Sequence, residues 1–159
     1  MSDFKAEHVT RTGSISLNGS IEEVFPLFGP VREGEWAHGW TITVLHAETD
    51  LVEEKGAVFT THLHGDLPTV WVITRYDPDD HRIEYARLTP DSRAAMVKIC
   101  CEASGDRTHA QVTYEITALH EHGNDYVREF TESAYHQMMA HWEQAINHRL
   151  MTGETLEHQ

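Results

Sequence analysis

The sequence predicts an α+β fold in which a curved antiparallel sheet of seven strands surrounds one long C-terminal helix. An amphipathic helical pattern runs from roughly Asn124 to Met151. Most of the preceding chain alternates between polar and apolar residues, as β-strands do, and only the short segment Ser20–Trp36 interrupts that pattern. The sheet is the only partner available to such a helix, so we expect a cavity between the two.

Each element has its own signal. A first strand is expected at Thr12–Asn18, and the run Ser20–Glu23 has the Ser-x-x-Glu form of a capping box, which starts a helix. Gly29-Pro30 ends this helix, and a second short helical turn is expected at Val31–Trp36. Turns of hairpin length separate the later strands, which indicates an antiparallel meander. These strands are predicted at Trp40–Glu48, Gly56–His64, Thr69–Tyr76, Arg82–Leu88, Ala94–Ala103 and Ala110–Leu119.

Length and cysteine use indicate one domain spanning residues 1–159, with its core at about residues 10–151. Cys100 and Cys101 are adjacent, so in a strand they point to opposite faces and a disulfide between them would be strained. We therefore expect a reducing compartment. The first residues lack an apolar signal region, and no run approaches the ~20 apolar residues that span a bilayer. The sequence predicts a cytoplasmic protein.

The charge balance restricts the partners. The chain has 12 basic and 26 acidic residues, a formal net charge of −14 with histidine neutral. Such a surface repels phosphate backbones and anionic headgroups, so we expect neither nucleic-acid binding nor membrane insertion. The sequence does not decide the oligomeric state, and a homodimer is one of the alternatives.

The C-terminal helix carries a mixed apolar stripe. At about 100° per residue, one side of the helix collects Val127, Thr131, Ala134, Met138, Trp142 and Ala145, flanked by Phe130, Tyr135 and Ile146. A helix that only filled a core would carry more leucine and isoleucine. The stripe therefore favours a helix that borders a cavity, and an ordinary packed core is the alternative.

Several stretches resemble the START-like helix-grip superfamily, also called SRPBCC, in its polyketide-cyclase/dehydrase-like branch. They are Phe28–Trp36 after the first helix, Val70–Ile73 and Ile83–Arg87 in two strands, and Trp142–Asn147 in the long helix. The resemblance covers about residues 10–150 and implies a helix-grip (START/Bet v 1-like) fold with a hydrophobic cavity. Members share the fold while differing in ligand and chemistry, so it implies no specific reaction.

Strand alternation supplies candidates for the cavity wall. Trp36 and Trp40 bracket the entry from the helical segment into the sheet, and either face of the strand that holds Trp71 could point inward. We expect a cavity of a few hundred Å3 that suits a flat or apolar small molecule. The candidate ligand-binding residues are Trp36, Trp40, Trp71, Tyr85, Arg87, Val97, Ile99, Tyr114, Phe130, Ala134 and Met138.

Two histidines share a strand face. His62 and His64 have a spacing compatible with metal ligation, and Asp66, His136 and His141 could supply a third ligand. The opposite face of that strand is the more apolar one, which makes a solvent-exposed pair the better interpretation. We expect these histidines to be metal-free, and we expect no cofactor.

Two further groups could carry chemistry. Arg87 with Tyr85 could hold an anionic or carbonyl group in an apolar pocket, and the alternative is an arginine at the rim paired with a surface carboxylate. Glu33, Glu35 and His38 could form an acid–base set, and the alternative is a solvated acidic turn.

The function expected from these features is binding of a hydrophobic or aromatic small molecule between sheet and helix. A cyclase, aromatase or dehydratase that uses the same cavity to fold a reactive chain is the alternative. A third reading is an interaction module resembling chaperone-activator domains, acting through its acidic surface. No nucleophile elbow, phosphate-binding loop, dinucleotide fingerprint or Cys-x-x-Cys motif is present in the sequence.

Overall fold

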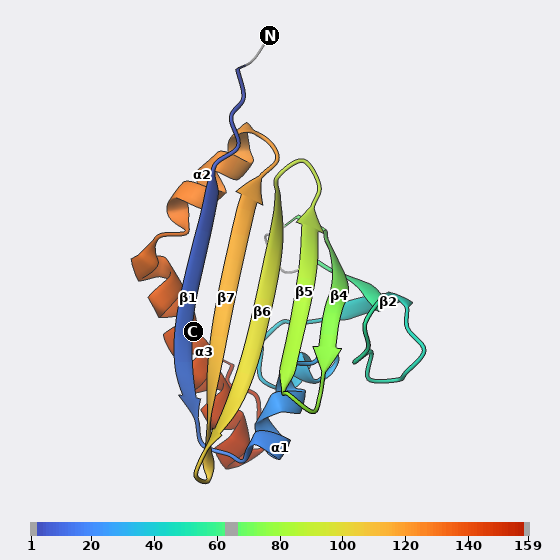
Figure 1. The fold of residues 1–159 in the computed structure, drawn as a ribbon, viewed down its shortest axis with the longest axis vertical. Helices are drawn as coiled ribbons and strands as arrows, with labels where there is room; N and C mark the ends of the chain where they lie inside the picture. The colour runs from blue at the N-terminus through green and yellow to red at the C-terminus, as the bar shows by residue number, and fades with distance from the viewer. Residues whose placement is uncertain (1–2, 63–66, 158–159) are drawn as a thin grey trace.

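Seven strands form one antiparallel sheet in the order β1-β7-β6-β5-β4-β3-β2, and helices cover one of its faces (Figure 1). This computed structural model describes residues 3–62 and 67–157. The elements in chain order are β1 His8–Leu17, α1 Ile21–Val24, η1 Phe25–Phe28, η2 Arg32–Glu35, β2 Ile42–His46, β3 Val58–Thr61, β4 Thr69–Asp77, β5 Arg82–Thr89, β6 Arg93–Ser104, β7 Arg107–Ala118, α2 Glu121–Glu129 and α3 Glu132–Thr152.

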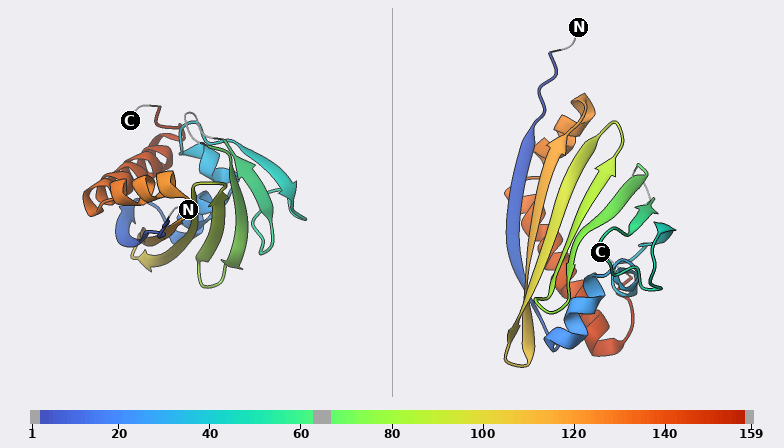
Figure 2. Two further views of the ribbon diagram at one scale, coloured as in Figure 1. Left: turned by 90° about the horizontal axis from the view of Figure 1, so that it is seen from above. Right: turned by 45° about the vertical axis from the view of Figure 1, so that its right-hand side comes forward.

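The sheet is a meander from β2 to β7, and the first strand closes onto the last, with Val9 opposite Ile116. It does not close into a barrel, because β1 and β2 remain as edges. Seen from above, the sheet curves and the helices lie on its inner side (Figure 2). This is the helix-grip architecture that the sequence predicts, and the fold prediction is confirmed.

The capping box at the first helix is confirmed. Ser20 Oγ accepts a hydrogen bond from Glu23 N at 3.3 Å, and Ser20 N donates to Glu23 Oε1 at 3.3 Å. The second short helical turn is the 3-10 helix η2. The predicted strands match β1 to β7 to within a few residues at their ends, although the predicted end of Gly56–His64 lies partly outside the described residues.

The prediction of one continuous helix from Asn124 is wrong. The chain forms α2, leaves helical geometry at Phe130 (φ −83°, ψ 61°), and starts again as the 21-residue helix α3. Thr131 is the N-cap of α3, and its Oγ1 accepts a hydrogen bond from Ala134 N at 3.1 Å. The long C-terminal helix is therefore confirmed, but it begins at Glu132.

The break also moves the buried stripe. In α3 the buried residues are Tyr135, Met139, Ala145 and Ile146. Thr131 is exposed and Met138 is half-buried, so the predicted stripe is one residue out of phase along the first turns of α3. The predicted stripe assumes a continuous 100° per residue through Phe130, where the helix is interrupted.

The inner face of the sheet and α3 share the hydrophobic core. Trp71, Ile73, Tyr85 and Val97 are buried there, which settles the open question of which β4 face points inward. The Tyr135 hydroxyl donates to the Val112 carbonyl and ties α3 to β7.

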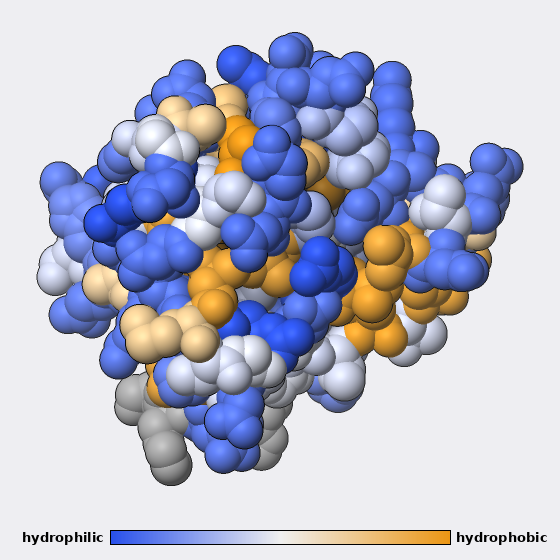
Figure 3. All heavy atoms as spheres, turned by 90° about the horizontal axis from the view of Figure 1, so that it is seen from below, coloured by the Kyte–Doolittle hydropathy of each residue, from blue (hydrophilic) through white to orange (hydrophobic). Residues whose placement is uncertain are grey.

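Seen from below, the surface is mostly hydrophilic, with hydrophobic atoms gathered near the centre and toward the right (Figure 3). Within residues 3–62 and 67–157, no helix combines the length and apolar character needed to cross a membrane.

Candidate functional site

A cavity of about 210 Å3 lies between the sheet, the η2 segment and α3. It is smaller than the pockets of about 300–1,000 Å3 that usually hold drug-sized ligands. All four tryptophans of the chain border it. Its wall consists of Glu33, Trp36, Ala37, Trp40, Trp71, Arg87, Tyr114, Met138 and Trp142.

Three of the tryptophans have their indole N–H groups bonded within the protein. Trp36 and Trp40 donate to backbone carbonyl oxygens at 2.7 and 2.8 Å, and Trp71 donates to Thr61 Oγ1 at 2.8 Å. Trp40 and Trp71 also meet edge to face, with ring centroids 5.6 Å apart. These bonds hold the rings in place, so the rings present aromatic carbon to the cavity. Other residues supply the polar groups of its wall.

Glu33 supplies the carboxyl group of the cavity from η2. Its side chain has no hydrogen bond or ion pair with any described residue, and the residue is half-buried. Desolvation raises the pKa of this carboxyl to about 8, and the charge of Arg87 opposes that rise only in part. Glu33 is therefore largely protonated at neutral pH.

Arg87 brings a positive charge to the same cavity from β5. Its Nη2 donates to Tyr126 Oη at a long 3.4 Å, while its Nε is buried without a hydrogen-bond partner. The guanidinium lies 5.3 Å from the centroid of Trp71 and 5.4 Å from that of Tyr114. Aromatic faces thus stabilise a cation whose hydrogen-bonding capacity is underused.

Tyr114 lies at the cavity wall, whereas Tyr85 lies outside it. Tyr114 borders the cavity, and burial raises its pKa above the ordinary tyrosine value although Arg87 lowers it. Tyr85 donates to the Phe28 carbonyl at 2.7 Å and so anchors η1 to the sheet. The structure thus places Arg87 beside Tyr114 at the cavity, and the Tyr85 hydroxyl is already bonded.

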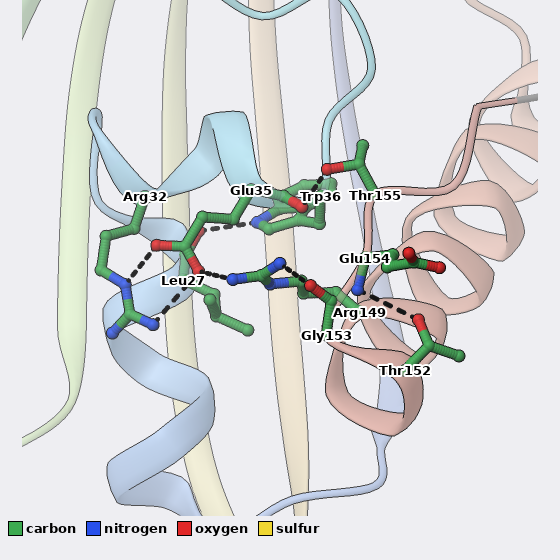
Figure 4. A network of polar contacts seen from close by, with 9 residues as sticks. All are labelled: Leu27, Arg32, Glu35, Trp36, Arg149, Thr152, Gly153, Glu154 and Thr155. Atoms are coloured by element: carbon green, nitrogen blue, oxygen red, sulfur yellow. Dashed lines mark hydrogen bonds and ion pairs between the residues drawn. The ribbon is translucent and has the colours of Figure 1, made fainter.

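The hypothetical set Glu33, Glu35 and His38 is separated in the structure. Glu35 points to the other side of η2, where Arg32 Nε (2.8 Å) and Arg149 Nη2 (3.0 Å) donate to its carboxylate (Figure 4). The Arg32 hydrogen bond lowers the pKa of Glu35 below its ordinary value, and Arg149 adds to the effect. His38 is exposed. Only Glu33 borders the cavity.

The expected ligand-binding residues fall into two groups. The cavity wall includes Trp36, Trp40, Trp71, Arg87, Tyr114 and Met138. Other members of the set pack elsewhere: Val97 and Ile99 are buried on the inner sheet face, and Phe130 packs on Tyr114 with centroids 5.8 Å apart. Tyr85 and the half-buried Ala134 also lie outside the wall.

Glu33, Ala37 and Trp142 also line the cavity, although none of them is among the expected ligand-binding residues. Trp142 carried a usable signal, because it lies on the predicted helix stripe. Ala37 carried none, since it follows a 3-10 helix in a turn.

The structure describes only one of the two histidines of the predicted pair. His62 is exposed, and His64 lies outside the described residues. Among residues 3–62 and 67–157, no group of three or more metal-ligating side chains is found. Their metal-free state remains an expectation.

A second, larger groove of about 400 Å3 lies on the outer face of the sheet. Its lining is largely aliphatic, and includes Val70, Val72, Leu88 and Met96. It lacks the aromatic wall and the Glu33 carboxyl of the inner cavity, which is therefore the stronger candidate site.

The fold is shared with solved structures of several kinds. The chain is similar to norcoclaurine synthase from Thalictrum flavum in complex with dopamine and hydroxybenzaldehyde (TM-score 0.63, 10% identity, 87% of this chain and 86% of that one). It is also similar to a START superfamily protein from Mycobacterium smegmatis (0.65, 13%, 91% and 98%). The protein Ara h 8.0201 is another neighbour (0.61, 11%, 88% and 98%).

These likenesses define the class of fold, a START/Bet v 1-like helix grip. Neither a protein-family model nor a curated protein sequence matches the chain. Because sequence identity to these structures is low, the similarity establishes the fold and leaves the ligand to be argued from the site.

Proposed function

We propose that this protein binds an apolar or aromatic small molecule in the cavity between the sheet and α3. The observation that carries the proposal is the gathering of all four tryptophans around one space. They meet edge to face in two pairs, Trp36 with Trp142 and Trp40 with Trp71, and still leave a space of about 210 Å3 beside them. Aromatic walls with a few polar groups are typical of small-molecule sites.

The fold is compatible with such a ligand. Norcoclaurine synthase, which has this fold, is in complex with dopamine and hydroxybenzaldehyde, two small aromatic molecules. At 10% identity this likeness supports the proposal through the shared architecture alone.

A cavity-filling variant tests the proposal. Ala37→Leu places extra carbon at the cavity wall, and Ala140→Leu adds the same atoms at an exposed site on α3. Thermal melts with a panel of apolar aromatic compounds should show stabilisation of the unmodified protein and of Ala140→Leu. Ala37→Leu should keep its fold and lose that stabilisation. Equal ligand stabilisation of all three proteins contradicts the proposal.

A second candidate function is an enzyme of the cyclase, aromatase or dehydratase type. The observation that favours it is Glu33, a carboxyl group with a pKa of about 8 at an aromatic cavity. Such a group can donate or accept a proton near neutral pH. Turnover of linear poly-β-ketone thioesters, followed by mass spectrometry, should disappear in Glu33→Gln. No turnover with the intact protein contradicts this candidate.

A further inference from the structure

Glu33 and Arg87 together define what kind of aromatic molecule fits the cavity. Arg87 has one long hydrogen bond, a buried unpartnered Nε, and a position at the cavity wall. Buried guanidinium groups usually pair with a carboxylate, often in bidentate fashion. Glu33 shares the cavity with Arg87, but no hydrogen bond or ion pair joins them in the described part of the chain.

Few titratable groups act on Glu33 among the described residues. Its own η2 neighbour Glu35 is bonded to Arg32 and Arg149 on the other side. From β4 and α3, the cavity wall contributes Trp71, Met138 and Trp142, none of which titrates. The ionisable groups that act on Glu33 across the cavity come from β5 and β7: Arg87, Tyr85 and Tyr114.

We propose that the ligand is an aromatic carboxylate, whose carboxylate pairs with Arg87 and accepts a hydrogen bond from a protonated Glu33. This inference rests on the proposed binding function and specifies its ligand class. At the interior packing density of about 0.74, the cavity of about 210 Å3 holds about 155 Å3 of ligand, the size of two fused rings with one substituent.

The pairing requires proton uptake when the solution is alkaline. A ligand carboxylate beside Glu33 disfavours a second negative charge, so Glu33 must hold its proton in the complex. Below the free-state pKa of about 8 the proton is already present, and above it each complex must take one up. Linkage then makes binding about 30-fold weaker at about pH 9.5 than at about pH 7.

A neutral analogue and three variants test the inference. Calorimetry compares 2-naphthoate with 2-naphthamide, which has the same shape without the charge, at both pH values and in buffers of different ionisation enthalpy. Naphthoate should bind more tightly than the amide at pH 7, with uptake approaching one proton at about pH 9.5. Glu33→Gln should remove the pH dependence of naphthoate binding. Arg87→Met should weaken naphthoate binding about tenfold and so remove its advantage over naphthamide. Arg82→Met, at an exposed position of the same strand, is the matched control.

The outcomes separate this inference from the proposed function. If naphthamide binds as tightly as naphthoate, or if naphthoate binding is independent of pH, the inference is wrong while the aromatic cavity remains. If neither compound binds, and neither do 1-naphthoate and indole-3-carboxylate or their amides, both proposals fail. Circular dichroism and amide binding show whether each variant is folded and keeps the cavity.

Discussion

Glu33 and Arg87 border one cavity from η2 and from β5, yet no hydrogen bond or ion pair joins them within the described residues. Glu33 is half-buried with no counter-ion in contact among these residues, and its partial desolvation raises the pKa of its carboxyl to about 8.

Glu33 should make the protein less stable as the pH rises. Between its unfolded pKa of about 4.3 and the folded value of about 8, the native state holds a proton that the unfolded state lacks. The free energy of unfolding therefore falls across this range, by at most about 5 kcal/mol and by less if water enters the cavity. Urea melts should show Glu33→Gln gaining stability over the parent protein as the pH rises from 5 to 8.5. The exposed Glu22→Gln is the control, and an equal gain at both pH values contradicts the account.

Glu35 should contribute to stability and leave ligand binding unchanged. Its carboxylate joins Arg32 of η2 to Arg149 of α3 (Figure 4). Glu35→Gln should cost about 1 kcal/mol at neutral pH, because the pair is only partly buried. Because the pKa of Glu35 is lower in the folded state, this contribution is fully present above the unfolded pKa and is lost as the pH falls through the folded pKa. Equal stabilities at neutral pH, measured against the exposed Glu154→Gln, speak against the bridge.

Met138 and Met139 form a natural test pair. Met139 is 4% exposed and packs in the core, whereas Met138 is half-buried and borders the cavity. Met139→Ala should cost the ~2–5 kcal/mol of a core truncation. Met138→Ala should cost less than the lower end of that range and change which aromatic compounds stabilise the protein. Denaturant melts with and without ligands measure both, and a larger loss for Met138→Ala would place it in solid core.

The two cysteines should differ in reactivity. Both are free thiols, with Cys101 buried on the inner sheet face and Cys100 half-buried on the other. Burial raises the pKa of the Cys101 thiol to about 12, so almost none is thiolate at pH 8. A chromogenic disulfide reagent should modify Cys100 first and reach Cys101 only on unfolding. Rapid labelling of Cys101 in the native Cys100→Ser variant contradicts this.

The strands were predictable because their signals are local. Alternation and turn residues specify each strand, and the hairpin-length turns specify their order. The helix break was missed because Thr131 is followed at the N3 position by Ala134, where a capping box would have Glu or Gln.

The polar pair of the cavity could not be found by reading neighbours along the chain. The sequence grouped Glu33 with Glu35, but residues two apart in a 3-10 helix point in different directions. It grouped Arg87 with Tyr85, whose hydroxyl bonds to Phe28. Glu33 and Arg87 border one cavity only because the tertiary fold brings η2 and β5 to the same space.

The indole resonances provide the most direct test of the cavity as the binding site. The chain has four tryptophans, and Trp36, Trp40, Trp71 and Trp142 all border the cavity. Indole 15N labelling therefore yields four side-chain signals that report on this one space, each assigned by a Trp→Phe substitution. Saturation with an aromatic ligand should shift all four. Binding that leaves the four signals unmoved, while methyl groups of the outer groove such as those of Val72 and Leu88 shift, would contradict a ligand between the sheet and α3.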